Sequence, residues 1–278
     1  MKKSGSVCGK IILSGEYAVV FGYPGIATPV SLTIDAEWEA KTSGGMEILL
    51  DERSERDGAR KYIEKILACL GKHQGMLNIR STIPIGRGMG SSTALVIAIT
   101  RAILGKDSKS EAMKIEDTMN PGHSGLDFAV IWDQKPVLFR KGFPSDHIQI
   151  PKDILNGAFL IDTGKPNETT PELVAWVKSR AEELSEPLKT IGQCTEKLIQ
   201  GGDFPSIVHD HHRAQMKLGV VPENATRLIH EIEKNDGSAK VLGAGGRTAG
   251  GGMVLILGIN ADALEKIAAK HRMPFFPL

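Results

Sequence analysis

A glycine-rich loop that ends in two serines could bind phosphate. It reads Pro84-Ile-Gly-Arg-Gly-Met-Gly-Ser-Ser-Thr-Ala94 and lies between an expected strand, 76–83, and an expected apolar helix, 92–104. Glycines let the backbone approach an anion closely and turn its N–H groups inward. A helix that begins near Ser91 adds unpaired N–H donors and the positive end of its dipole. The loop could therefore hold the phosphates of a nucleotide.

The same residues also allow a purely structural interpretation. In a tight turn, Ser91 or Ser92 would only cap the following helix. A dinucleotide fingerprint is excluded because it requires a glycine at position 91, and a Walker A loop is excluded because it requires Gly-Lys followed by Ser or Thr. A capped turn and a phosphate loop of a third kind remain as alternatives.

Two acidic residues follow the loop in the sequence. Asp127 comes directly after the turn 120–126 and before an apolar segment, 128–132, for which we expect a strand. A rigidly held aspartate suits a general base or a metal ligand, although many turn aspartates only accept hydrogen bonds from neighbouring N–H groups. Glu116, on an expected helix over 109–119, could point to the same place or be a solvated carboxylate.

Two further segments could complete such a site. Lys10 opens the apolar strand 10–13, where a partly buried ammonium group would require a carboxylate partner. The segment 243–252 contains six glycines in ten residues between two expected strands. That number exceeds what one turn requires, which indicates a second close approach of backbone to a ligand or to the first loop.

In this order, the four segments resemble the motifs of the GHMP kinase superfamily, which includes galactokinases, homoserine kinases, mevalonate kinases and phosphomevalonate kinases. The loop 84–94 resembles the signature Pro-x-x-x-Gly-Leu-Gly-Ser-Ser-Ala-Ala, with Met89 in place of Leu and Thr93 in place of Ala. Segments 9–20 and 240–252 resemble the first and third motifs. Mevalonate kinases are most similar, although Tyr17 replaces a histidine and His123 replaces a proline of their motifs.

The resemblance implies an ATP-dependent kinase that phosphorylates a small-molecule alcohol, with the 5-hydroxyl of mevalonate as the expected acceptor. Asp127 would take the proton of that hydroxyl, and Lys10 would pair with Asp127 and stabilise the alkoxide. Ser92 and Glu116 would hold Mg²⁺. The residues that would bind the phosphates of ATP are Gly86, Gly88, Met89, Gly90, Ser91, Ser92 and Thr93.

Other implications of the resemblance concern the acceptor and the assembly. Glu16 and Thr170 would help to shape the substrate pocket. Mevalonate kinases are commonly dimers, so a homodimer is also expected. The third motif departs from the usual pattern, because Arg247-Thr-Ala249 lengthens it before its last glycines.

The order of the expected elements predicts an α+β fold. Strands dominate the first third, at 10–13, 18–21, 32–40 and 46–50. From about residue 153, long helices near 171–184, 186–200, 204–217, 222–235 and 261–271 surround further strands. The resemblance implies a two-lobed GHMP kinase fold, with a mixed α/β N-terminal lobe at 1–152 and a ferredoxin-like C-terminal lobe at 153–278.

Composition limits the partners of the chain. Its formal net charge of +1 over 278 residues gives no overall field that would attract nucleic acid or an anionic membrane. No stretch approaches the ~18 apolar residues of a membrane span. We therefore expect a soluble, cytoplasmic protein without nucleic-acid or membrane partners.

Two alternative functions remain open. Phosphomevalonate kinase, or another GHMP kinase, is the alternative enzyme, since Gly-Glu-Tyr-Ala-Val also occurs in phosphomevalonate kinases. A non-catalytic protein that binds a ligand with the same fold is the second alternative. Such a protein would be expected to lack the base or the lysine, and both Asp127 and Lys10 are present.

Overall fold

The computed structural model describes residues 2–56, 58–151 and 153–278, and the chain divides into two compact units. The first unit consists of Met1–Lys10 and Pro29–Lys135, and the second of Ile11–Thr28 and Pro136–Leu278. Each unit is therefore built from two separate parts of the chain. The lobes expected at 1–152 and 153–278 remain a prediction, and their boundary residue 152 lies outside the described residues.

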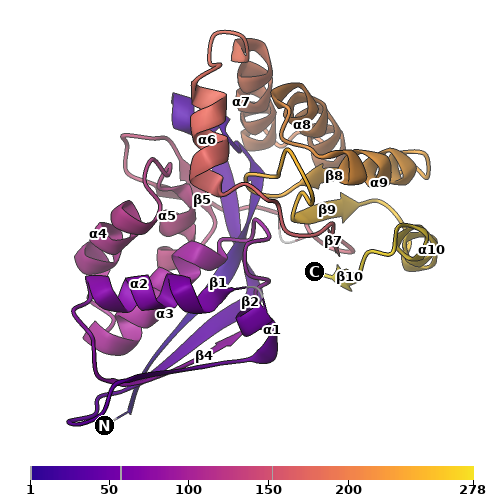
Figure 1. Cartoon of the computed structure of the whole chain (residues 1–278). Coiled ribbons are helices and arrows are strands. Elements are labelled where there is room, and N and C mark those ends of the chain that lie inside the picture. Colours follow the sequence, from indigo (N-terminus) through magenta and orange to yellow (C-terminus); the bar gives the residue numbers. More distant parts are fainter. Residues whose placement is uncertain (1, 57, 152) are drawn as a thin grey trace. The chain divides into compact units, whose positions relative to one another are not determined.

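The first unit combines a small sheet with a group of helices. Strand β2 (Gly25–Glu39) pairs with β1 (Lys2–Ser14) and runs antiparallel to β4 (Gly75–Ser81), which lies parallel to β3 (Met46–Leu50). The helices of this unit are α1 (Glu52–Arg56), α2 (Ala59–Cys69), α3 (Ser91–Leu104), α4 (Lys109–Met119) and α5 (Leu126–Asp133). Helices α2 to α5 contact one another and gather beside the strands (Figure 1).

Helix α3 forms the core of this group. Its residues from Ala94 to Ile99 are all buried, because the helix is apolar on nearly every face and other helices surround it. Helix α2 instead buries one stripe, Ile63, Ile66 and Leu67, at the spacing of an amphipathic helix. The central helix α3 therefore fixes the position of the loop that precedes it.

The second unit is an antiparallel sheet with helices. Its strand order is β10 (Phe275–Pro277), β7 (Phe159–Asp162), β9 (Met253–Leu257) and β8 (Ser238–Val241). The helices of this unit are α6 (Thr170–Lys178), α7 (Ser185–Ile199), α8 (Phe204–Leu218), α9 (Glu223–Glu233) and α10 (Ala261–His271). Helices α8 and α9 contact β8, and α7 packs along α8 (Figure 1). Near its start, β2 pairs with β5 (Val137–Phe139), which pairs with β6 (Asp146–His147).

The predicted α+β class is confirmed, and most predicted helices are present within a few residues of their expected bounds. Helix α4 has the expected range, whereas α6 ends at Lys178 rather than at residue 184. Among the described residues, no helix is long and apolar enough to cross a membrane.

Two predicted strands are wrong. The segment 128–132 belongs to helix α5, because Gly125 (φ 98°) turns the chain and the apolar run after it packs against α3. A short apolar run suits a buried helix as well as a strand, so periodicity could not decide. The segment 18–21 is a short 3-10 helix, η1 (Ala18–Phe21), which follows Tyr17 (φ 63°) and ends at Gly22 (φ 89°). Asp127 therefore stands in the first turn of a helix and not before a strand.

Candidate active site

The glycine loop leads from β4 into α3. The N-cap of α3 is Gly90, which has a left-handed backbone (φ 78°) and no side chain to cap the helix. The first backbone N–H of α3 that donates to a carbonyl oxygen four residues earlier is that of Ala94, and its acceptor is the carbonyl oxygen of Gly90. The N–H groups of Ser91, Ser92 and Thr93 therefore have no intrahelical acceptor, as expected at a helix start. They form a set of donors that suits an anion.

Space as well as conformation requires glycine at position 90. A Cβ atom there would lie 2.8 Å from Cδ1 of Ile131 and 3.0 Å from Cγ of Lys10. The positive φ would add strain for any L-residue. Gly90 therefore allows the start of α3, the side chain of Lys10 and helix α5 to approach one another closely.

The two serines of the loop have different environments. Ser91 is buried, and its Oγ accepts a hydrogen bond of 3.0 Å from the N–H of Gly86, which closes the loop on itself. Ser92 is only partly buried. The side chain of Met89 is fully buried and packs in the core, so only its backbone could contact a ligand. Ser91 thus stabilises the loop, whereas Ser92 is the less buried of the two serines and lies beside Tyr62.

Lys10 and Asp127 form an ion pair in the first unit. The Nζ atom of Lys10 lies 3.1 Å from Oδ1 of Asp127 and donates to the carbonyl oxygen of Gly88 at 3.1 Å. Lys10 is 1% exposed, whereas the side chain of Asp127 is 35% exposed. An ammonium group has three N–H donors, so one remains for a ligand atom beside the accessible carboxylate. The expected partnership of the two residues is thus present in the geometry.

Glu116 lies on α4 and is buried next to the start of α3. Its Oε1 accepts a hydrogen bond of 2.7 Å from Oγ1 of Thr93. Within the described part of the chain, its Oε2 is buried without a hydrogen-bond partner. Burial raises the pKa of Glu116, and the charge of Asp127 adds to this, whereas the hydrogen bond from Thr93, the charge of His123 and the nearby amide of Asn120 oppose it. An additional cation would satisfy the free oxygen.

The surroundings of Glu116 fit a magnesium ion. Mg²⁺ prefers carboxylate and hydroxyl oxygens and commonly uses only one or two protein ligands besides phosphate and water. Tyr62 lies near both expected ligands, because both affect the pKa of its hydroxyl. Burial and the charge of Glu116 raise the pKa of Tyr62, whereas hydrogen bonds from Asn120 and Ser92 lower it. Asn120 donates to the Tyr62 hydroxyl at 2.9 Å. Glu116 and Ser92 are thus close to one polar cluster, and the free Oε2 suits a hard cation.

The second unit contains Glu16, but the side chain is enclosed. Lys240 donates a hydrogen bond to its Oε1, and Nε2 of His211 lies 3.0 Å from its Oε2. Burial alone would raise the pKa of Glu16, but the charge of Lys240 and the interaction with His211 outweigh it and lower the pKa to about 2. Burial and the charge of Lys240 lower the pKa of His211. The carboxylate is therefore ionised and enclosed between Lys240 and His211.

Sequence reasoning did not assign Lys240 and His211 to this cluster. A signal existed for Lys240, because a lysine within the apolar strand β8 requires a buried acid. No comparable signal existed for His211, which lies in an ordinary amphipathic helix. Thr170, the other expected pocket residue, is exposed as the first residue of α6, where Thr169 caps the helix.

The lengthened third motif is fixed within its own unit. The Glu168 carboxylate accepts hydrogen bonds from Oγ1 of Thr248 at 2.7 Å and from the N–H of Arg247 at 3.2 Å. The guanidinium group of Arg247 stacks on the ring of Trp176 at 4.3 Å. The inserted residues are therefore held by side chains of the loop before α6 and of α6 itself.

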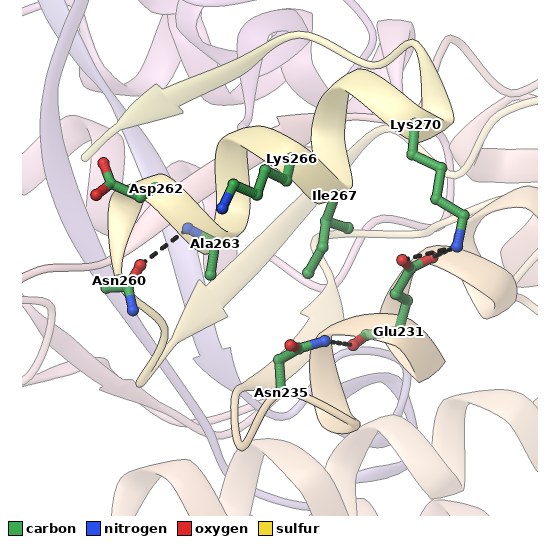
Figure 2. Close-up of a pocket in the computed structure, with 8 residues that line it drawn as sticks. All are labelled: Glu231, Asn235, Asn260, Asp262, Ala263, Lys266, Ile267 and Lys270. Atoms are coloured by element: carbon green, nitrogen blue, oxygen red, sulfur yellow. Dashed lines mark hydrogen bonds and ion pairs between the residues drawn. The ribbon is translucent and has the colours of Figure 1, made fainter.

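A surface pocket of about 580 Å³ lies between α9 and α10 of the second unit (Figure 2). Its polar groups largely bind one another: Lys270 pairs with Glu231 at 2.9 Å, and Asn260 accepts a hydrogen bond from the N–H of Ala263 at 2.8 Å. None of the residues expected in the active site lines it. The lining residues are Glu231, Asn235, Asn260, Asp262, Ala263, Lys266, Ile267 and Lys270.

Comparison with known proteins identifies related sequences and folds. Residues 58–130 match the family model of the GHMP kinases N terminal domain. The mevalonate kinase of Pyrococcus abyssi is 26% identical, and the match covers 87% of this chain and 85% of that protein.

Two solved structures show the same fold over nearly the whole chain. The mevalonate kinase of Methanococcus jannaschii superposes with a TM-score of 0.74 at 22% identity, covering 99% of this chain and 96% of the other. The phosphomevalonate kinase of Streptococcus pneumoniae, solved with phosphomevalonate and AMPPNP, gives 0.73 at 17% identity, covering 99% of each chain. The chain therefore has the fold of these kinases, and its residues 58–130 match the GHMP kinases N terminal domain.

Proposed function

We propose that the chain is an ATP-dependent kinase that phosphorylates the 5-hydroxyl of mevalonate. The observation that supports this most directly is the pair formed by buried Lys10 and accessible Asp127, 3.1 Å apart and beside Gly88 of the glycine loop. The acceptor is inferred from relatives named mevalonate kinase that align with 87% of the chain.

In the proposed reaction, Asp127 accepts the proton of the acceptor hydroxyl as the oxygen attacks the γ-phosphorus of ATP. A bond forms between that oxygen and phosphorus, and the bond from phosphorus to the bridging oxygen breaks, which releases ADP. The third N–H of Lys10 stabilises the negative charge that develops on the attacking oxygen. An aspartate beside an ammonium group is a weak base, but phosphoryl transfer depends on positioning and charge neutralisation more than on base strength.

The phosphates of ATP are assigned to the glycine loop and the start of α3. The N–H groups of Ser91, Ser92 and Thr93 are the donors that α3 leaves without intrahelical acceptors. Glu116 and Ser92 are proposed to hold Mg²⁺, which when bound would neutralise charge on the transferred phosphoryl group.

Other assignments remain predictions of the family resemblance. Lys240 and His211 lie against the Glu16 carboxylate. We therefore propose that Glu16 shapes the pocket by fixing the turn in which it lies and not by contacting the acceptor. Thr170 keeps its expected place in that pocket. A cytoplasmic location and a homodimer also remain predictions.

Phosphomevalonate is the second candidate acceptor, because a phosphomevalonate kinase shares the fold with a nearly equal TM-score of 0.73. The test is the rate of ADP release by the purified protein with ATP and Mg²⁺, measured with mevalonate and with phosphomevalonate in parallel. Turnover of phosphomevalonate alone would refute the proposed acceptor and leave the kinase assignment intact.

Variants test the assigned residues. We expect Asp127→Asn and Lys10→Met each to lower kcat by about 10²–10⁴-fold. The matched controls are Asp210→Asn and Lys197→Met, which remove the partners of an exposed ion pair of 3.0 Å in the second unit. Activity of D127N and K10M equal to that of these controls would contradict the assignment.

A further inference from the structure

The hydroxyl of Thr93 is directed at Glu116 and not at a phosphate. Thr93 is 2% exposed and Glu116 is 1% exposed, and Oγ1 of Thr93 donates to Oε1 of Glu116 at 2.7 Å. A hydrogen bond to a buried carboxylate is stronger than one between neutral groups. Only the backbone N–H of Thr93 therefore remains for the phosphates assigned to this loop.

A second threonine on α3 shows that this contact is a specific one. Oγ1 of Thr100 donates to the carbonyl oxygen of Val96 at 2.7 Å, which is the usual bond of a threonine inside a helix. Thr93 forms its bond with a carboxylate 23 positions away in the sequence. The phosphate-loop signature that this chain resembles has an alanine at position 93, so the hydroxyl is an addition to that pattern.

The bond fixes one oxygen of the Glu116 carboxylate and leaves the other available. Oε1 is held by Thr93, whereas Oε2 is buried and has no hydrogen-bond partner within the described ranges. A buried anionic oxygen without a partner is costly unless a cation or donor meets it. Because the carboxylate is planar, fixing Oε1 also restricts the direction in which Oε2 points.

We infer that Thr93 is a positioning residue that holds Glu116 so that Oε2 faces the Mg²⁺ of the bound nucleotide. The inference rests on the proposed function, because that function requires the metal. In this arrangement the Thr93 side chain holds the metal ligand Glu116, and the backbone of the glycine loop binds the phosphates. Partners of this kind orient carboxylate ligands, and their removal commonly weakens metal affinity by about 10–100-fold.

Thr93→Val tests this role because valine has the shape of threonine without the hydroxyl. Mn²⁺ serves as the probe: its binding to the protein saturated with a non-hydrolysable ATP analogue is measured by electron paramagnetic resonance of free Mn²⁺. We expect the Mn²⁺ dissociation constant to rise by about 10-fold in T93V. Thr93→Ser, which keeps the hydroxyl, should bind Mn²⁺ like the wild type.

Thr100→Val is the matched control, since it removes an equally buried hydroxyl from the same helix. Its Mn²⁺ affinity should equal that of the wild type. In kinetic assays, T93V should require about 10-fold more Mg²⁺ for half-maximal rate, whereas T93S should not. A thermal unfolding scan of each variant checks that it is folded, and Thr93→Ala replaces T93V if valine is not tolerated.

The outcomes separate this inference from the proposed function. Equal Mn²⁺ affinity in T93V, T100V and the wild type would overturn the role of Thr93 and leave the proposed function intact. The same conclusion would follow if T93S and T93V lost Mn²⁺ affinity to the same extent. Absence of Mn²⁺ binding by the wild-type complex would overturn both. Loss of affinity in T93V, restored in T93S, would support the inference even if mevalonate were not the acceptor.

Discussion

Replacing Lys240 by methionine should strongly destabilise the second unit. The side chains of Lys240 and Glu16 are 0% and 1% exposed, so water does not reach the ion pair that they form. Methionine would fill most of the volume of the lysine stem but would leave the Glu16 carboxylate in the core without its countercharge. The burial that lowers the pKa of His211 persists in the variant, so protonation of His211 would replace the lost charge only in part.

The expected size of the effect follows from this burial. Removal of one partner of a buried ion pair costs about 3–5 kcal/mol, and the lack of solvent screening at this site places Lys240→Met within that range. For a chain of this length, each kcal/mol lowers the melting temperature by about 2–4 °C, so we expect a decrease of about 10 °C.

The pH dependence gives a second, independent measurement. In the wild type, the pKa of Glu16 is lowered from 4.5 to about 2, so the stability that this group contributes is present above pH 4.5 and is lost as the pH falls toward 2. In K240M, burial persists and the charge of Lys240 is gone, so we expect the pKa of Glu16 to rise above its ordinary value. The carboxylate then takes up a proton more readily in the folded state, and the deficit of K240M should shrink as the pH falls from 7 to 5.

Urea unfolding at pH 7 and pH 5 measures both effects, with Lys197→Met as the control because it breaks only an exposed ion pair. That control should cost at most about 1 kcal/mol. Adding Glu16→Gln to K240M should recover part of the loss, since it removes the stranded charge. A cost below about 1 kcal/mol for K240M, or strictly additive effects of the two changes, would refute the reasoning.

Two further changes test other parts of the structure. Gly90→Ala should destabilise the first unit by about 1–3 kcal/mol in urea unfolding, because it adds crowding against Ile131 to the strain of a left-handed φ. Gly142→Ala has the same sign of φ but no atom within 4 Å of the new Cβ, so equal losses in both variants would contradict the crowding argument. Burial, aided by the charge of Arg213, lowers the pKa of His212 to about 3, so protonation favours the unfolded chain below about pH 6.5. His212→Gln should therefore flatten the decline in stability between pH 6.5 and pH 4, and an unchanged slope in acid titrations of unfolding would exclude His212 as its source.

Features that depend on neighbouring residues could be predicted from the sequence. The glycine loop and the helix that follows it could be predicted because glycine spacing and an apolar run are local patterns. Helix α4 has the predicted bounds for the same reason. Lys10 and Asp127 were paired in advance through the family resemblance, which contains information about distant positions that spacing alone does not.

Which buried polar groups meet depends on how distant segments pack together. The apolar run 128–132 became helix α5 because packing against α3 outweighed an ambiguous local pattern. Glu16 is paired with Lys240, 224 positions away, and Glu116 accepts a hydrogen bond from Thr93. The partner of a buried charge depends on which groups the fold brings within hydrogen-bond distance. A sequence indicates that a buried charge needs a partner, whereas the identity of that partner is fixed only when distant segments pack together.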